Sequence, residues 1–267
     1  MGKKREKANY MIQSVSHAID VLEELSKAGG EVGVTELSKR LKLHKNNVFR
    51  LLATLELRGY VEQNMETEDY RLGVKSLQLG QAYLAQSDLV QRSLPIMRKL
   101  SEGLGETVSL AVLQNGQVQF PISIASKRPV SVSARINVSL PAKMNAAGRL
   151  LTAQLPDSML DELLASNTPQ DAAIKNQLHE LRKTGVIMDK SAIEADVTAI
   201  AKVVTGHNKQ VVGAIEVLAP QYRAKAESIM ASVEEAANEL SLTLGASKPG
   251  LIATIEKEIT NTTTASM

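Results

Sequence analysis

The sequence predicts an α+β fold with two domains. Its 267 residues exceed the size of a typical single domain, and a hydrophobic content of 43% is enough for two ordinary cores. Apolar residues recur at helical spacing up to about residue 104 and alternate with a period of two after Gly105. A helical amino-terminal part is therefore expected to precede a part that contains a sheet.

The first predicted helix spans Ser14 to Lys27, and two glycines that follow it stop it. Thr35 is expected as the N-cap of a short second helix that ends near Leu41. A tight turn containing Leu43 then leads into a third helix. Two short amphipathic helices joined in this way predict a helix-turn-helix.

The third helix has a narrow apolar stripe, which predicts that it packs on a core through that side. The stripe consists of Val48, Leu51, Leu52 and Leu55. Asn46, Arg50 and Ala53 therefore point outwards, with Lys45 and Asn47 beside them. Long cationic and amide side chains in such positions reach the phosphates and base edges of a major groove.

Basic residues are concentrated around this turn. The stretch from Lys39 to Arg50 holds Lys39, Arg40, Lys42, Lys45 and Arg50 and no acid, although the whole chain has 31 basic and 29 acidic residues. Taken alone, the stretch is equally well explained as a solvated face. Combined with the helix-turn-helix it predicts DNA binding through these residues: Thr35, Lys42, His44, Lys45, Asn46, Asn47, Arg50 and Arg71.

Two short strands, Tyr60 to Gln63 and Tyr70 to Leu72, are expected to form a wing after the third helix. Its Arg71 is placed to approach the phosphate backbone. The turn between the strands carries Glu66, Glu68 and Asp69, so the tip itself should contribute little affinity for DNA.

The remaining chain predicts an antiparallel sheet with helices around it, with room for a small-molecule cavity. The domain boundary is placed near Asp88, between two helices. Asn115-Gly116 is a strong signal for a β-hairpin turn. The predicted helices are Val74 to Gln86, Val90 to Leu104, Lys143 to Gln154, Ser158 to Ser166, Asp171 to Thr184 and Gln221 to Leu244. The predicted strands are Val108 to Val112, Val118 to Ile124, Val130 to Ile136, Val197 to Thr205 and Gln210 to Leu218.

Several kinds of protein are disfavoured. Cysteine is absent, and neither a signal peptide nor an apolar run long enough for a membrane span is supported, so a cytoplasmic protein is expected. His17, His179 and His207 lack a partner at helical spacing, and His44 is interpreted as a turn residue or phosphate contact, so no metal site is expected. No nucleophile elbow or phosphate-cradling glycine loop occurs, which argues against an enzyme, catalytic residues or a cofactor.

The chain from about Gln13 to Gly245 resembles the IclR family of bacterial transcriptional regulators. The amino-terminal segments SVSHAIDVLEELS, VTELSKRLKLHKNNVFRLLATLELRGYVEQ and YRLGVKSLQLG follow the family pattern without a gap. Further along, SLPAKMNAAGRLLTAQL resembles the family's LHATAxGKAxLA segment, TGVIMDKSAIEADVTAIAKVV resembles GYAxDxEExxxGxxCIAAPV, and VVGAIEVLAP resembles the AxSVSGP strand.

The resemblance implies a winged helix-turn-helix domain over residues 1–73 and a linker helix over 74–88. A GAF-like effector-binding and oligomerisation domain over 89–247 and a carboxy-terminal tail over 248–267 complete the expected organisation. Relatives of this kind usually act as a homodimer or a dimer of dimers on a palindromic operator in double-stranded DNA. Repression is the commoner outcome.

The resemblance also implies a pocket for a small-molecule effector, carried over by position. It would be lined by Val132, Leu140, Ala146, Ala147, Asp189, Val197, Ala199, Glu216 and Leu218. Ala199 stands where cysteine is usual, and Glu216 and Leu218 stand where small hydroxyl residues are common. A small anionic effector is therefore disfavoured unless Lys143, Arg135 or Arg149 turns inward, which leaves an uncharged, hydroxylated or cationic ligand.

Two interpretations of this domain stay open. In one, a metabolite bound there controls DNA binding; in the other, the domain has lost its ligand and serves only oligomerisation. Asp189 is equally well explained as a loop cap or surface acid. Strict alternation puts Glu216 on one face of its strand with Val212, Ala214 and Leu218. If that face is interior, the glutamate must be paired or carry a raised pKa, because burying it alone is costly.

Overall fold

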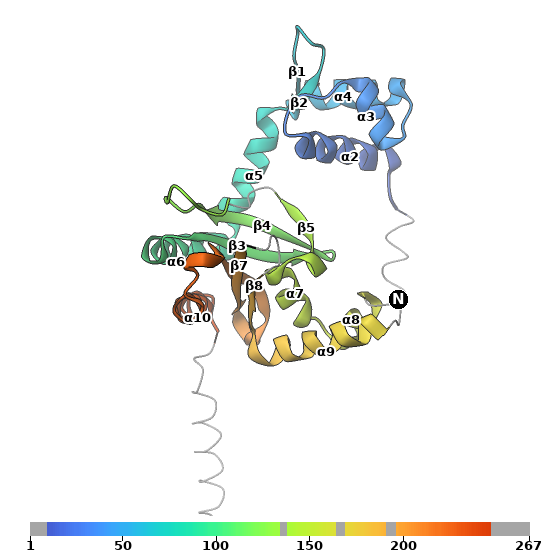
Figure 1. Cartoon of the computed structure of the whole chain (residues 1–267). Coiled ribbons are helices and arrows are strands. Elements are labelled where there is room, and N and C mark those ends of the chain that lie inside the picture. Colours follow the sequence, from blue (N-terminus) through green and yellow to red (C-terminus); the bar gives the residue numbers. More distant parts are fainter. Residues whose placement is uncertain (1–9, 134–137, 164–168, 191–195, 247–267) are drawn as a thin grey trace, which may run out of the picture. The chain divides into compact units, whose positions relative to one another are not determined.

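The computed structural model describes residues 10–133, 138–163, 169–190 and 196–246 (Figure 1). The chain divides into two compact units, Met1–Gln86 and Ser87–Met267. The first is mostly helical and ends in a hairpin and a helix, whereas the second combines helices with an antiparallel sheet. The predicted α+β class is confirmed.

In its described residues, unit 1 is a three-helix cluster with a two-stranded hairpin and one further helix. Its elements are α2 (Gln13–Ala28), α3 (Val34–Leu41), α4 (Lys45–Leu57), β1 (Val61–Gln63), β2 (Tyr70–Leu72) and α5 (Val74–Gln86). The core between them contains Val21, Leu37, Val48 and Leu52, none of which has any exposed surface. The apolar stripe predicted for α4 therefore does face the core.

The turn between α3 and α4 has well-defined ends. Lys42 adopts a left-handed conformation (φ 55°) and ends α3, and the Ser38 hydroxyl donates to the Leu43 carbonyl at 2.6 Å. The expectation that Thr35 caps α3 is wrong, because Gly33 is the N-cap and the helix begins at Val34, two residues earlier than a Thr35 cap would place it. Thr35 lies instead in the first turn, exposed to solvent.

The wing is an antiparallel hairpin in which Val61 pairs with Leu72 and Gln63 with Tyr70. Tyr70 is 2% exposed and also forms a bridge with Val32, so it ties the hairpin to the helical core. Burial raises the pKa of the Tyr70 hydroxyl. The wing therefore has a fixed base on the unit.

Helix α5 packs differently from the other helices of unit 1. None of its described residues is buried, and four large apolar side chains are more than half exposed: Val74, Leu77, Leu79 and Tyr83. Such an apolar surface on a solvent-exposed helix usually marks a contact with another molecule.

Unit 2 is a six-stranded sheet with helices on both faces. Its helices are α6 (Asp88–Leu104), α7 (Ala146–Ala153), α8 (Asp157–Leu163), α9 (Pro169–Thr184) and α10 (Ala226–Thr243), with short 3-10 turns η1 (Ala142–Met144), η2 (His207–Lys209) and η3 (Gln221–Arg223). Its strands are β3 (Thr107–Gln114), β4 (Gln117–Ile124), β5 (Ser139–Pro141), β6 (Val186–Asp189), β7 (Val197–Thr205) and β8 (Val211–Pro220).

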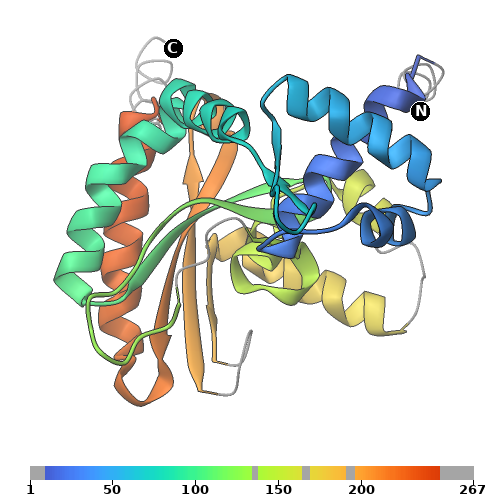
Figure 2. The same ribbon diagram turned by 90° about the horizontal axis from the view of Figure 1, so that it is seen from above.

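The strands are antiparallel in the order β5-β4-β3-β8-β7-β6. Figure 2 shows α6 and α10 side by side over one face of the sheet, with α7 and α9 on the other side. Asn115 and Gly116 form the β3–β4 turn, both at positive φ (51° and 74°), as the sequence predicts. Strand β8 lies in the middle and is buried along most of its length.

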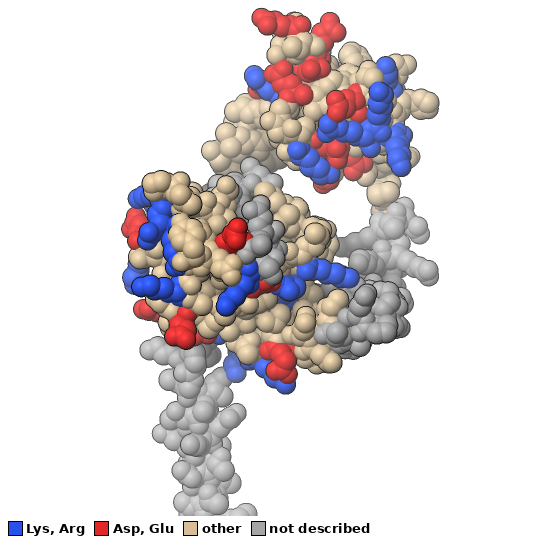
Figure 3. Space-filling view, in the orientation of Figure 1, with Lys and Arg blue, Asp and Glu red and all other residues tan. Residues whose placement is uncertain are grey.

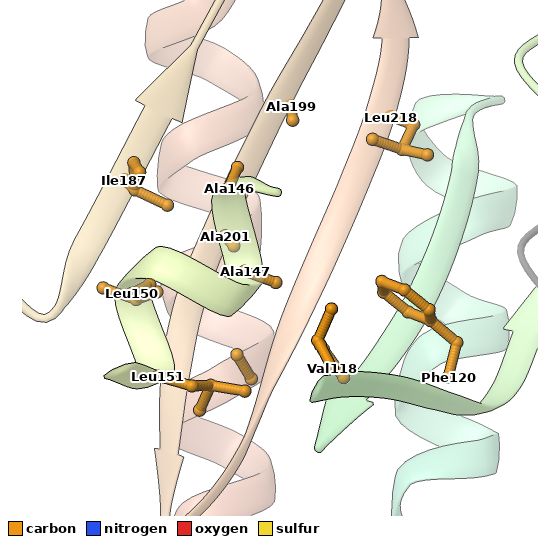
Figure 4. Close-up of a cluster of buried hydrophobic side chains, with 12 residues drawn as sticks. Val118, Phe120, Ala146, Ala147, Leu150, Leu151, Ile187, Ala199, Ala201 and Leu218 are labelled. Atoms are coloured by element: carbon orange, nitrogen blue, oxygen red, sulfur yellow. The ribbon is translucent and has the colours of Figure 1, made fainter. Parts of the chain in front are cut away.

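The core on the α7 side of the sheet is made by strand residues that meet the first turns of α7 (Figure 4). Ala199 and Ala201 from β7 and Leu218 from β8 lie against Ala146 and Ala147 of α7. All five are without exposed surface. The alanines on both sides let the helix approach the strands closely.

Some predicted boundaries need correction. The predicted strand from Val130 is irregular as far as Ser133, because side chains rather than a neighbouring strand satisfy its carbonyls; residues 134–137 lie outside the described residues. The helix predicted from Lys143 begins at Ala146, since Asn145 is extended (φ −137°) and caps it. The final helix begins at Ala226 rather than Gln221, after the turn η3. Strands β5 and β6 were not predicted.

In the part of the chain that the structure describes, no helix combines the length and apolarity that a membrane crossing needs.

Gly148 marks a point of close backbone approach between α7 and η1. A Cβ atom on Gly148 would lie 2.7 Å from the Ala142 Cα and closer still to its carbonyl oxygen, both backbone atoms that do not move aside cheaply. Only glycine fits at this position, although glycine in a helix normally costs about 0.5–1 kcal/mol relative to alanine.

We predict that Gly148→Ala lowers the free energy of unfolding by about 1–3 kcal/mol, because the clash with η1 outweighs the gain in helix propensity. The matched control is Gly103→Ala in α6, where an added Cβ meets no atom within 4 Å, so stability should rise by up to about 1 kcal/mol. Urea unfolding of the full chain, followed by circular dichroism, measures both. Equal effects of the two substitutions would contradict the close approach.

Candidate functional site

The exposed surface of α4 carries the residues predicted to meet DNA. His44 is the N-cap residue of α4, and Lys45, Asn46, Asn47 and Arg50 follow on its first turns, all exposed. Thr35, Lys42 and Arg71 are exposed as well. The structure therefore brings all eight predicted residues to the surface of unit 1, seven of them on α3, α4 and the turn between them.

The cations on this surface differ in their partners. Among the described residues, Lys42, Lys45 and Arg50 form no ion pair with a carboxylate. Arg40, by contrast, pairs with Glu36 one turn earlier on α3 and lies 4.0 Å from Glu24. The positive charge available to a polyanion is therefore concentrated at the start of α4.

Arg71 on the wing is shared between two carboxylates. Its guanidinium lies 3.5 Å from Glu31 and 3.4 Å from Glu62, while 59% of the side chain remains exposed. Glu31 also accepts hydrogen bonds from Asn64 (2.8 Å) and Thr67 (3.3 Å), which fix the base of the wing turn. Figure 3 shows acidic atoms at the wing tip and basic atoms over the α3–α4 end of unit 1.

A groove of about 560 Å³ runs along the edge of α4 that faces α2. Asn47, Arg50 and Thr54 line it from α4, and Val15, Ala18 and Ile19 line it from α2. Asn47 and Arg50 therefore stand on the α2 side of the exposed face of α4.

The predicted effector site has a fully buried floor in unit 2. Sheet register places Ala199 and Leu218 opposite each other, and Glu216 pairs with Ala201 on one side and Ser109 on the other. The amino-terminal turn of α7 covers these positions. Five of the nine predicted residues have no exposed surface: Ala146, Ala147, Ala199, Glu216 and Leu218.

The other four predicted residues, Val132, Leu140, Asp189 and Val197, are partly exposed. The Val132 carbonyl accepts a hydrogen bond from Thr107 at 2.6 Å. The nearby Val130 carbonyl accepts from Arg223, whose guanidinium also donates twice to Glu106 at 2.6 and 3.0 Å. The hydrogen bond with Glu106 raises the pKa of Arg223, and this pair holds the segment at Val130 beside the start of β3.

Glu216 is a buried carboxylate at the start of α7. Its Oε1 accepts hydrogen bonds from the Ala147 backbone N–H at 3.3 Å and from the Asn145 side-chain amide at 3.4 Å. Asn145 in turn accepts from the Gly148 N–H at 2.7 Å and so caps the helix. The alternation that put Glu216 on the Leu218 face is confirmed as an interior placement, and the carboxylate is paired, as burial requires.

Asp189 forms an ion pair with Arg149 of α7. The Asp189 side chain is 15% exposed and that of Arg149 is 34% exposed. Burial lowers the pKa of the Arg149 guanidinium, and its Nε has no hydrogen-bond partner among the described residues. Lys143 is exposed, and Arg135 lies outside the described residues.

Two side-chain partners in this region were not predicted from the sequence. Asn145 donates a hydrogen bond to Glu216, and Arg149 forms an ion pair with Asp189. The signal was an Asn immediately before an alanine-rich helix, which is the pattern of an N-cap. Among the residues that the structure describes, no group of three or more His, Cys, Asp or Glu is arranged to hold a metal ion.

These features define a DNA-binding module joined to a separate α+β domain. Comparison with known proteins agrees: residues 14–64 match the IclR helix-turn-helix domain, and residues 81–242 match the bacterial transcriptional regulator IclR C-terminal domain. The chain belongs to the IclR family of transcriptional regulators, and the resemblance drawn from the sequence is confirmed.

Two curated relatives illustrate the likeness. The chain is 29% identical to the HTH-type transcriptional regulator XynR of Escherichia coli over 214 residues, which is 77% of this chain and 85% of XynR. It is 26% identical to the transcriptional repressor IclR of Escherichia coli over 252 residues, which is 89% of this chain and 92% of that repressor. These relatives are transcriptional regulators and not enzymes.

Solved structures show the same fold. An IclR-type regulator from a Silicibacter species has a TM-score of 0.76 at 29% identity, over 89% of this chain and 98% of the other. An IclR homologue from Microbacterium hydrocarbonoxydans, solved with 4-hydroxybenzoate, has the same TM-score of 0.76 at 23% identity, over 86% of this chain and 98% of the other.

We predict that Asn145→Ala lowers the free energy of unfolding by about 2 kcal/mol or more, because it removes both the cap of α7 and a donor to the buried carboxylate. Ser87→Ala, which removes the 3.4 Å N-cap contact of α6, is the control and should cost no more than about 1 kcal/mol. Denaturant unfolding of both variants measures the difference. If the two costs are equal, the contact between Asn145 and Glu216 contributes nothing.

Proposed function

We propose that this regulator recognises a near-palindromic operator as a dimer and responds to a small molecule bound in unit 2, most simply as a repressor. The observation that carries the DNA-binding part is the α4 surface, where Lys45, Asn46, Asn47 and Arg50 are exposed above a buried apolar stripe. The family membership and the repressors among its relatives support this assignment.

The proposed roles follow from side-chain chemistry. Asn46, Asn47 and Arg50 read base edges in the major groove, because amides and guanidinium groups make the paired hydrogen bonds that distinguish bases. Lys42 and Lys45 contact phosphates on either side, with Thr35 and His44 near the same backbone. Arg71 gives a weaker phosphate contact, since Glu31 and Glu62 already neutralise part of its charge.

A second copy of the chain is the proposed partner of α5. This helix buries none of its described residues and exposes Leu77, Leu79 and Tyr83. A symmetric dimer would set two recognition helices about one turn of DNA apart, which is the reason to expect a near-palindrome.

The proposed effector binds at the rim of the site in unit 2, above the floor formed by Ala199 and Leu218. The structural neighbour that was solved as a complex with 4-hydroxybenzoate supports small-molecule binding by a protein of this fold. In this chain the floor carries a carboxylate, so an uncharged or cationic ligand is favoured. To change DNA binding, the ligand must bind two conformations with different affinity, and the segment from Val74 to Leu104 is the proposed transmitter.

The alternative is a unit 2 that binds no effector and serves only oligomerisation. One observation favours it: five of the nine predicted effector residues are fully buried and packed in the core. The two functions differ in whether any metabolite stabilises the protein, which a thermal-shift screen measures.

We predict that Arg50→Ala weakens specific operator binding about 10-fold or more and relaxes preference at one base position in each half-site. Selection of binding sites from random DNA, followed by gel-shift titration of the best site, measures both effects. Lys225→Ala, at an exposed lysine just before α10 in unit 2, is the control and should change neither. Unchanged affinity and preference in Arg50→Ala would remove this residue from the interface.

We predict that an uncharged or cationic metabolite raises the melting temperature of the wild-type protein and shifts its operator affinity in the same concentration range, because a ligand that binds only the folded state stabilises it. A thermal-shift screen of metabolites grouped by charge is the measurement. A screen in which no class raises the melting temperature, with operator binding intact, would support the oligomerisation alternative instead.

A further inference from the structure

Phe49 is a large apolar residue on the exposed surface of α4. It is 55% exposed, although phenylalanine is one of the residues most often buried in proteins. The other phenylalanine of the chain, Phe120, is 3% exposed and lies in the core of unit 2. The core contacts of α4 are made by its buried stripe, which includes Val48 and Leu52, and Phe49 does not belong to that stripe.

The Phe49 ring lies among the side chains expected to meet DNA. Residues three and four positions apart share one face of an α-helix. Phe49 therefore lies one turn after Lys45 and Asn46 and one turn before Ala53, all of them exposed. Arg50 lines the groove on the α2 side of this face, and the turn of about 100° per residue sets Phe49 on the other side.

The chemistry of a phenyl ring limits what it can read in DNA. The ring has no hydrogen-bond donor or acceptor of the kind that contacts phosphates and base edges. A recognition helix enters the major groove, where the faces of the bases are stacked on one another. The apolar group that a base edge presents in this groove is the C5-methyl group of thymine. Contact between the ring and this methyl group removes apolar surface of both from water, which is favourable.

The charges around the ring favour its approach to DNA. The first three turns of α4, from Lys45 to Leu55, contain no acidic residue, and the acid of this helix is Glu56 near its end. Lys45, one turn before the ring, forms no ion pair among the described residues. Phosphates are therefore attracted to the end of α4 that carries Phe49.

We propose that Phe49 reads thymine: its ring contacts the C5-methyl group of one thymine in the major groove of each operator half-site. This proposal rests on the proposed DNA-binding function and names a base that the ring recognises. It implies that the protein distinguishes thymine from uracil, which offers the same hydrogen-bonding groups and lacks only the methyl group.

The test removes one methyl group at a time from the operator. The probe is the best operator selected from random DNA by the wild type, with each thymine of the half-site replaced in turn by deoxyuridine in both half-sites. Gel-shift titration of the wild type should find one position where this replacement weakens binding by about 3-fold or more for each half-site. Phe49→Ala should bind the thymine operator more weakly than the wild type and should bind both forms equally at that position.

Leu57→Ala is the matched control, because Leu57 is also a large exposed apolar residue of α4 (86%) but lies about two turns further on, at the end of the helix. This variant should distinguish thymine from uracil as the wild type does. Phe49→Leu, which keeps an apolar side chain at the same position, should retain part of the discrimination.

Two results would overturn the role of Phe49. In one, Phe49→Ala still prefers thymine to uracil at the sensitive position. In the other, the preference persists and the sedimentation mass of Phe49→Ala falls below that of the wild type, which would make the ring a contact between two copies of the chain.

The selection step separates the failure of this proposal from the failure of the proposed function. A wild type that selects no common sequence from random DNA would refute the proposed function and the role of Phe49 with it. A wild type that selects an operator, and binds every deoxyuridine form of it as tightly as the thymine form, would refute only the role of Phe49.

Discussion

A buried carboxylate at the start of one short helix is the interaction on which unit 2 depends. Glu216 has no exposed surface, and its hydrogen bonds to Asn145 and Ala147 join the central strand β8 to α7. Because an unsatisfied buried charge is very costly, these contacts fix where α7 begins. The same contacts place Ala146 and Ala147 over Ala199 and Leu218, so the floor of the candidate effector site follows from them.

The two units differ in how their charged side chains are arranged. Unit 1 has its own core and exposes unpaired cations at the start of α4, which suits recognition of a polyanion. In unit 2, the little-exposed carboxylates of Glu106 and Asp189 are paired with Arg223 and Arg149. Helix α5 ends unit 1 and α6 begins unit 2, so any signal along the chain passes through these two helices.

Much of this fold was predictable from local patterns. Hydrophobic periodicity and the residues that end helices and strands both act over only a few positions in the chain. The bounds of α5, β2 and β7 agree with the prediction, since Gly and polar turns limit them. Strands β5 and β6 have only three and four residues, which is too few to show an alternation of apolar and polar side chains. The contact of Glu216 with Ala147, 69 residues away, depends on tertiary packing, so alternation predicted the face of Glu216 but not its partner.

The central claim is that this chain recognises specific DNA, and selection of fragmented genomic DNA by the purified protein tests it most directly. Fragments retained at about 50 mM and at about 200 mM salt are sequenced, because phosphate contacts alone weaken steeply over this range. The account predicts that a small set of fragments sharing a near-palindrome survives at the higher salt. Weak, uniform retention that disappears at the higher salt would contradict it, since the α4 surface would then provide only nonspecific attraction.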